Sequence, residues 1–360
     1  MPNRRLRVLC KILRARGNDG RDRLERARAG RIIRWASARI LQAALVPALA
    51  VLTAACGSTA MHDTGSTTGS QTRTTTSTTG PLPGTGRPPV VIGDKNTPEQ
   101  FVLGELYEEA LTAEGFSVSL NRNIGPTQVT IRAMRQGSLN LYPEYIDVWN
   151  KEVAHETGSF SSSRAAYAAG QRFANRQGLK LLNPTPFGNT EALAVTDYYA
   201  GQHSLTAVRD LRTVGRSLTV GGPPQFKSAG LVALQRAYGF TSQLFRVLPV
   251  GEQYQALNQN AVQAADVNTT DGDLATGDYR VLKDPNHVLG WGNVVPVVTQ
   301  QTLEKEGPTF AATINAVSSL LTVSAMRQMN EQVEQHIDPA AVAAQFLETH
   351  GLIAPGQGSS

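Results

Sequence analysis

Residues 90–111 read VVIGDKNTPEQFVLGELYEEAL, and this stretch contains the signals for a strand, a loop and a helix in that order. The apolar run 90–93 predicts a buried strand. Thr97-Pro98-Glu99-Gln100 has the form of a capping box with proline at the first helical position, so a helix is expected to begin here. It would end near Gly115 and present its apolar residues on one face, namely Leu103, Leu106, Tyr107, Ala110 and Leu111.

The same alternation of strand and helix continues along the chain. Residues 117–124 and 139–142 predict two more strands around a short helix at 126–136. A second series predicts strands at 192–195, 217–222 and 265–267 and helices at 207–215, 227–239 and 254–260. After a strand at 294–298, only helices are expected, at 308–321, 323–336 and 339–350. Such alternation indicates mostly parallel sheets covered by helices, so we expect an α/β protein with two lobes and a cleft between them.

Aromatic residues are unusually dense in one segment, LYPEYIDVWN at 141–150, although the chain is only 6% aromatic. Ligands of open α/β sheets bind beyond the carboxyl ends of the strands. Both this segment and the loop 93–97 are expected there. From composition alone the aromatic cluster is either a piece of core or a surface that holds a ligand.

The charge of the chain is unevenly distributed. The first 50 residues hold 13 Lys or Arg against 3 Asp or Glu, whereas the remainder holds 21 against 26. The net charge of +5 therefore comes from the N-terminal segment, and the rest is mildly acidic. No basic face indicates binding to nucleic acid.

The N-terminal segment, residues 1–55, has the order of a signal peptide with a long basic arm: a basic region, an apolar run at 40–55 and small residues before Cys56. The run of about 16 residues is shorter than the roughly 20 that a membrane-spanning helix needs. LTAAC at 52–56 resembles a bacterial lipobox, although Thr53 stands where Leu is commoner. We expect cleavage before Cys56 and lipidation of its sulfur; the alternative is an ordinary signal peptide with an incidental cysteine.

A segment rich in Ser, Thr and Gly follows at 56–88 and predicts a disordered tether. Its reach is about 30 Å if each residue contributes as in a flexible coil. A folded body would then be held beside a membrane, on the periplasmic side or on the outer face of the plasma membrane.

Catalytic and metal-binding motifs are missing from the sequence. It has no GxSxG, GxxxxGK[ST], or GxGxxG after a strand, and its six histidines form no HxH or HExxH pair. Cys10 and Cys56 indicate neither a disulfide framework nor a metal site. We therefore predict no catalytic residues, no metal and no cofactor, and an enzyme is the weaker hypothesis.

Six motifs in order give the chain a family resemblance: IGDKNTPEQFVLGELY, NLYPEY, FGNTEALAV, GGPPQF with LVALQRAYG, DVNTTDG and NVVPVV. Together they resemble substrate-binding proteins of ABC importers for glycine betaine, choline, carnitine and related osmoprotectants. The resemblance covers about residues 89–353. It implies the two-lobed type II periplasmic-binding-protein fold, in which each lobe is a mixed sheet flanked by helices. The implied lobes are 89–190 with 293–353, and 191–292, with the ligand in the cleft.

The resemblance also implies an aromatic cage around a quaternary ammonium group, with Tyr145 as one wall. Tyr142 is expected to face the core and Glu144 to fix the turn. Lys95 stands at a position that often touches the ligand carboxylate. Lys227 is placed, by a shorter segment, near the position of a cleft arginine.

Other cage positions depart from the family. Asn189-Thr190-Glu191 replaces NTY, so that Glu191 stands where a cage Tyr is expected, and Asn268 stands where an aromatic precedes the TTD-like motif. Gly292, next to Trp291, replaces another Tyr, and Val148 replaces Thr or Asp. The predicted ligand-binding residues are therefore Lys95, Tyr145, Asn189, Glu191, Lys227, Asn268 and Trp291.

These departures change the expected ligand. A carboxylate attracts a cation and also accepts N–H hydrogen bonds, which a quaternary ammonium cannot donate. Our hypothesis is that Tyr145 and Glu191 face each other around the cationic end of the ligand while Lys95 holds the anionic end. The ligand is then either an osmoprotectant betaine or a protonated amine or guanidinium. If the match to the family motif is shifted at this point, Glu191 is instead a solvent-facing acid.

The predicted protein is a monomeric, lipid-anchored, extracytoplasmic binding protein that delivers a small cationic or zwitterionic solute to an ABC permease and its ATPase. A ligand sensor with the same lobes is the alternative. The tryptophans outside the leader, Trp149 and Trp291, both flank presumed cleft motifs, so both are expected to report lobe closure.

Overall fold

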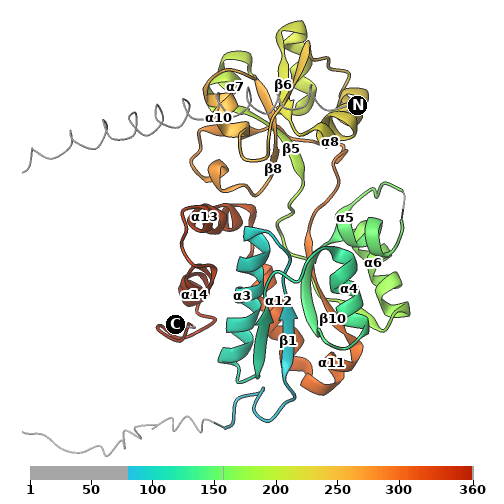
Figure 1. Cartoon of the computed structure of the whole chain (residues 1–360), viewed down its shortest axis with the longest axis vertical. Coiled ribbons are helices and arrows are strands. Elements are labelled where there is room, and N and C mark those ends of the chain that lie inside the picture. Colours follow the sequence, from blue (N-terminus) through green and yellow to red (C-terminus); the bar gives the residue numbers. More distant parts are fainter. Residues whose placement is uncertain (1–79, 157, 359–360) are drawn as a thin grey trace, which may run out of the picture. The chain divides into compact units, whose positions relative to one another are not determined.

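A computed structural model describes residues 80–156 and 158–358 (Figure 1). The predicted signal peptide, the lipidation site Cys56 and most of the tether lie outside these residues. Within the described ranges no single helix is long and apolar enough to cross a membrane. One helix pair, Pro308–Leu320 with Val323–Glu334, passes that test jointly but is bent by 89°.

The first sheet has five strands in the order β2-β1-β3-β10-β4. They are β1 (Val90–Gly93), β2 (Val118–Asn121), β3 (Leu141–Tyr145), β4 (Leu179–Leu181) and β10 (Val294–Thr299). β1 is parallel to β2 and β3, whereas β10 is antiparallel to both β3 and β4. The helices of this lobe are α3 (Pro98–Ala113), α4 (Thr127–Arg135), α5 (Ile146–Val148), the π-helical η1 (Trp149–Val153), α6 (Ser163–Arg176), α11 (Gln300–Glu306), α12 (Pro308–Leu320), α13 (Val323–Glu334) and α14 (Pro339–Thr349).

The second sheet repeats this plan in the order β7-β6-β8-β5-β9. Its strands are β5 (Glu191–Thr196), β6 (Thr219–Gly222), β7 (Leu244–Val247), β8 (Ala264–Asn268) and β9 (Tyr279–Val281). β6 is parallel to β7 and β8, and β5 is antiparallel to β8 and β9. The helices are α7 (Asp197–His203), η2 (Val208–Thr213), η3 (Gly215–Ser217), α8 (Pro224–Ser228), α9 (Gly230–Tyr238), α10 (Gln253–Asn258) and η4 (Gly272–Ala275).

Two chain segments join the sheets, one between β4 and β5 and one between β9 and β10. They run antiparallel where Gly188 bridges Asn293, and the Asn189 N–H donates to the Gly292 carbonyl at 3.0 Å. The predicted two-lobed α/β fold is confirmed, with two mixed sheets rather than mostly parallel ones. The reason is that β10 and β5 each run against both of their neighbours.

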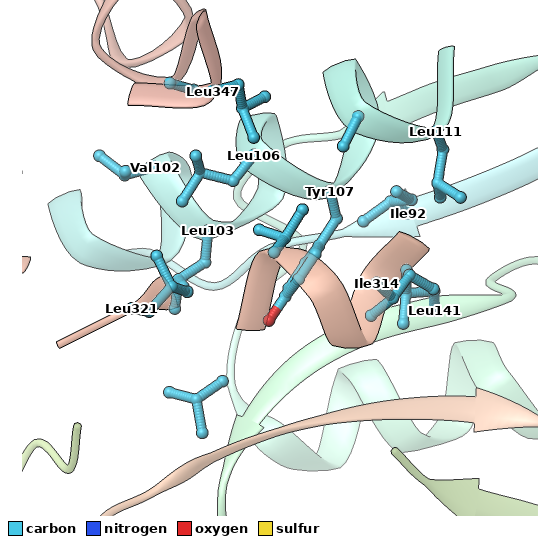
Figure 2. Close-up of a cluster of buried hydrophobic side chains, with 14 of the residues drawn as sticks. Ile92, Val102, Leu103, Leu106, Tyr107, Leu111, Leu141, Ile314, Leu321 and Leu347 are labelled. Atoms are coloured by element: carbon cyan, nitrogen blue, oxygen red, sulfur yellow. The ribbon is translucent and has the colours of Figure 1, made fainter. Parts of the chain in front are cut away.

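The opening stretch forms the predicted strand and helix. The Thr97 hydroxyl accepts the N–H of Gln100 at 3.4 Å, and Pro98 occupies the first turn. The return bond of the capping box is not made, because the Thr97 N–H donates to the Lys95 carbonyl at 2.8 Å. The predicted apolar face is buried, and Figure 2 shows Leu106 and Tyr107 among side chains from β1, β3, α12 and α14.

The strand predicted at 139–142 begins two residues later, and the expectation that LYPEY lies beyond the end of a strand was wrong. LYPEY is the strand β3 itself rather than a loop beyond a strand, in spite of Pro143. Pro143 lies opposite Pro296, whose carbonyl accepts the N–H of Leu182 and so faces β4. Because β1 pairs with β3 at Ile92 and Leu141 and ends one residue later, Pro143 interrupts no ladder on that side.

The helix predicted at 227–239 is also interrupted. It divides into α8 and α9 at Ala229, whose φ of −121° and ψ of −75° are not helical. After the break, the Gly230 backbone packs closely on the Phe226 ring: a Cβ there would lie 2.6 Å from it. The helix predicted at 207–215 forms the 3₁₀ segments η2 and η3 instead.

Candidate functional site

A cavity of about 670 Å³ is the candidate site. Its lining residues are drawn from 147–156 and 158–160, which follow β3, from the α8–α9 junction at 229–233, and from 287–291 before β10, together with Glu191 at the start of β5. This volume lies within the usual range for small-molecule sites. The cavity is therefore large enough to hold a small solute.

Charged side chains of both signs line this cavity. The acids are Asp147, Glu156 and Glu191, and Lys151 is the lysine. Glu191 is an exposed residue at the start of β5; the desolvation that its carboxyl does experience raises its pKa, while the positive charge of Lys151 acts in the opposite direction. A cavity with separate acidic and basic side chains suits a ligand that carries both charges.

Trp291 provides an aromatic wall, and its position is fixed at three points. Its backbone N–H donates to Asp147 Oδ2 at 2.6 Å, and its indole N–H donates to the Phe160 carbonyl at 3.1 Å. Its ring stacks on His287, with centroids 3.7 Å apart and planes inclined at 21°. Both the backbone and the indole ring of Trp291 are therefore held in place.

Gly292 leaves no room for a side chain at the position where an aromatic residue was expected. Its φ is +55°, a left-handed conformation, and a Cβ on it would overlap the Asn189 carbonyl oxygen. A tyrosine at this position would collide with the other segment that joins the lobes. The adjacent Trp291 is the residue whose ring reaches the cavity.

Tyr145 and Asn189 are brought together by a residue that was not predicted to be in the site, Glu99. The Tyr145 hydroxyl donates to Glu99 Oε1 at 2.6 Å, and Asn189 Nδ2 donates to the same oxygen at 3.1 Å. Tyr145 is half-buried and packs against the first-lobe core. Neither Tyr145 nor Asn189 is among the residues that line the cavity.

The positive charge of Lys95 is already paired with a carboxylate of the protein. Its Nζ lies 2.5 and 2.6 Å from the two carboxylate oxygens of Glu144 and donates to Thr127 Oγ1 at 2.9 Å. Glu144 is fully buried in β3, so the prediction that it fixes a turn was wrong. Burial raises the pKa of Glu144 and Lys95 lowers it. Lys95 would have to leave this partner to hold a ligand carboxylate.

Asn268 and Lys227 also lie outside the cavity lining. Asn268 pairs with Glu191 across β8 and β5, and its backbone N–H donates to Asp271 Oδ2 at 3.0 Å. Lys227 is exposed on α8, with its Nζ 5.5 Å from the centre of the Phe245 ring. Of the seven predicted residues, Glu191 and Trp291 line the cavity together; the ligand-binding roles of all seven stay predictions.

Trp149 does not face the cleft as predicted. Its side chain is fully buried, and its indole N–H donates to the Gly170 carbonyl at 3.2 Å. Its ring meets Phe173 edge to face. The aromatic cluster is thus divided: Tyr142 and Trp149 are core, as expected for Tyr142, while Tyr145 is half-buried.

Asp266 is a second acid near Glu191 that sequence reasoning missed. Glu191 pairs with Asn268 and Leu193 with Asp266, which puts both acids on one face of the sheet. Burial, and then the charge of Glu191, raise the pKa of Asp266 to about 8. Its Oδ1 has no hydrogen-bond partner within the described part of the chain. Its place inside ADV at 265–267 looked like an ordinary strand position.

Comparisons with known proteins agree on one class. The family model for the substrate-binding domain of ABC-type glycine betaine transport systems matches residues 88–349. A glycine-betaine-binding protein of Pseudomonas aeruginosa is 30% identical over 74% of this chain and 89% of its own length. The glycine betaine-binding protein YehZ of Escherichia coli is 26% identical over 75% and 93%.

Solved structures show the same likeness. The crystal structure of a glycine betaine/carnitine/choline ABC transporter protein is 25% identical, with a TM-score of 0.69, and covers 73% of this chain and 99% of that chain. Apo YehZ is 27% identical, with a TM-score of 0.66 and the same coverage. These two neighbours match the two-lobed fold described above.

Proposed function

Because the chain belongs to the family of substrate-binding domains of ABC-type glycine betaine transport systems, we propose that it binds a small cationic or zwitterionic solute and delivers it to a membrane permease driven by an ATPase. The observation that supports this proposal best is the shared position of Glu191 and Trp291 in the lining of one cavity. An acid and an aromatic ring are the two groups that attract an organic cation.

The cationic end of the solute is assigned to Glu191 and Trp291. The face of an indole ring carries negative potential and attracts a cation by about 0.5–2 kcal/mol. The Glu191 carboxylate adds charge attraction and accepts N–H hydrogen bonds. A protonated amine or guanidinium uses both contributions, whereas glycine betaine, a quaternary cation without N–H groups, uses only the electrostatic part.

The anionic end of a zwitterion is assigned to Lys151 rather than to Lys95. Lys151 lines the cavity and acts electrostatically on Glu191. Lys95 is bound to both oxygens of Glu144, and its side chain is only 12% exposed. A ligand carboxylate that binds Lys151 therefore leaves the ion pair between Lys95 and Glu144 intact.

We also propose that the protein is anchored outside the cytoplasm through a lipid on Cys56. The lipobox-like LTAAC and the Ser/Thr/Gly-rich segment 56–88 support this. A tether of about 30 Å would let the folded part search for the permease close to the membrane.

A thermal-shift screen of the mature chain tests the binding function. Osmolytes, amines and amino-acid betaines are added singly, and a true ligand at a hundred times Kd should stabilise the fold by about 2.7 kcal/mol. Trp291→Ala should abolish most of the shift, whereas the exposed control Glu304→Gln should retain it. A panel without any shift, or a shift that Trp291→Ala leaves unchanged, would contradict the assigned site.

A further inference from the structure

Glu99 is a buried acid that three donors share. Its carboxylate accepts from the Tyr145 hydroxyl at 2.6 Å and from Asn189 Nδ2 at 3.1 Å through Oε1, and from Asn330 Nδ2 at 3.1 Å through Oε2. Glu99 is 5% exposed, and none of the ion pairs recorded for the described residues includes it. Glu99 lies in the first turn of α3, at the positive end of the helix dipole.

The hydrogen-bond network extends from Glu99 into the second lobe. Asn330 on α13 also donates through Nδ2 to the Thr270 carbonyl at 2.8 Å, and Arg327 on the same helix donates to the Thr269 carbonyl at 2.8 Å. The Thr269 hydroxyl accepts the N–H of Thr190 at 3.1 Å and donates to the Gly188 carbonyl at 2.8 Å. Segment 268–271 begins at Asn268, the strand partner of Glu191.

We propose that Glu99 is a positioning residue that couples Tyr145 and Asn189 to segment 268–271, and so to Glu191, through Asn330. A hydrogen-bond path then connects β3 of the first lobe with the strand end of the second lobe that carries the cavity acid. The coupling is inferred from the hydrogen bonds, and its effect on ligand binding rests on the proposed function.

The coupling requires a carboxylate and not merely a side chain of this size. Both Glu99 oxygens accept, so Glu99→Gln puts an NH₂ group opposite a donor at one of them. Asn330 could turn its oxygen toward that NH₂, but its Nδ2 would then leave the Thr270 carbonyl. In the alternative orientation of the substituted amide, the NH₂ lies against the Tyr145 hydroxyl and Asn189. In either case one arm of the network is lost.

Hydrogen exchange tests the coupling without any ligand. The reporters are the backbone amides of Thr190 and Thr269. The Thr190 N–H donates to the Thr269 hydroxyl, and the Thr269 N–H donates to the Thr190 carbonyl. Glu99→Gln and Asn330→Ala should each raise their exchange about tenfold, and the double variant should add no more than about twofold. The matched control is Glu105→Gln, a buried acid of the same helix that pairs with Arg122 outside this network; it should leave both amides within about twofold of wild type.

Exchange in Glu99→Gln within twofold of wild type, or effects of the two single variants that multiply in the double variant, would overturn the proposal. If Glu99→Gln does not fold, Tyr145→Phe removes one donor and should still raise Thr269 exchange, and no change there overturns the proposal as well. Calorimetry with glycine betaine keeps the two proposals apart. If Trp291→Ala leaves its binding unchanged while the exchange results hold, the binding site assigned to Glu191 and Trp291 fails and the coupling stands.

Discussion

Asp147 and Trp291 are joined across the site: one carboxylate oxygen, Oδ2, accepts the N–H of Trp291 at 2.6 Å and that of Gly292 at 3.2 Å. These bonds link the segment after β3 to the segment before β10. Since Trp291 provides the aromatic wall of the cavity, Asp147 controls where that wall stands.

We therefore predict that Asp147→Ala releases the Trp291 ring and weakens solute binding about tenfold, because two hydrogen bonds to a charged acceptor are lost. Acrylamide quenching provides a direct measurement. In the chain without its leader, which carries Trp35, the other tryptophan is the fully buried Trp149, so the additional quenching in the variant comes from Trp291. Asp147→Asn, which keeps an acceptor oxygen, should show a smaller effect. Unchanged quenching and affinity in Asp147→Ala would show that Trp291 does not depend on this carboxylate.

The raised pKa of Asp266 should make the free energy of unfolding depend on pH. Its folded pKa of about 8 lies above the ordinary value of 3.8, so the native state holds a proton that the unfolded state has lost. The stabilisation is complete below about 4 and is lost as pH rises through about 8, so the free energy of unfolding should fall across this window. Urea unfolding of wild type and Asp266→Asn between pH 6.5 and 8.5 measures it.

Asp94 is the control for that experiment. Burial raises its pKa to about 6, so its own contribution is largely lost before the measured range begins. Asp94→Asn should keep the fall in stability above pH 6.5, and Asp266→Asn should flatten it. An equal slope in wild type and Asp266→Asn would mean that Asp266 is already ionised at neutral pH.

Gly292 should tolerate no side chain. Gly292→Ala combines a left-handed backbone with an overlap between the new Cβ and the Asn189 carbonyl oxygen, so it should destabilise the protein by more than the roughly 1–2 kcal/mol of the backbone term alone. Gly277→Ala is the matched control, because Gly277 has a φ of +83° and nothing within 4 Å of its added Cβ. Denaturant midpoints that shift equally in both variants would mean that the contact with Asn189 has no effect.

Membrane attachment should depend on Cys56. Cys56→Ala, expressed with the native leader in a bacterial host, is expected to leave the membrane fraction, because the sulfur is the proposed lipid attachment site. Fractionation without detergent measures this. Equal solubility of the wild type and the variant would contradict the lipid anchor.

The sequence predicted the elements whose signals are local. The apolar runs at 90–93 and 294–298 are the strands β1 and β10, and Thr97 with Pro98 begins α3. It predicted a strand at 139–142 but not that β3 continues through Pro143 to Tyr145, because Pro143 reads as a strand breaker and its tolerance depends on Pro296 and on where β1 ends. Short elements such as β4 and β9 have too few residues for a periodic signal.

The site was harder to predict than the fold, because charges are compensated by residues far away in the sequence. Lys95 was predicted to touch the ligand, but its pairing with Glu144 across 49 residues is a tertiary contact that no local signal indicates. Glu99 read as part of a helix cap, and its three donors come from residues 145, 189 and 330. Glu191 could be singled out because an acid replaced an expected aromatic residue at a strand end.

The most direct test of the proposed binding site is calorimetry of Glu191→Gln with two solutes, glycine betaine and arginine. We expect arginine, whose guanidinium donates N–H bonds, to lose at least about tenfold in affinity, since its cation would lose its ion partner. Glycine betaine should lose about threefold or less, because it makes no N–H bond to the acid. Affinities within twofold of wild type for both solutes, or no binding of either to wild type, would contradict the assignment of Glu191 to the cationic end of the ligand.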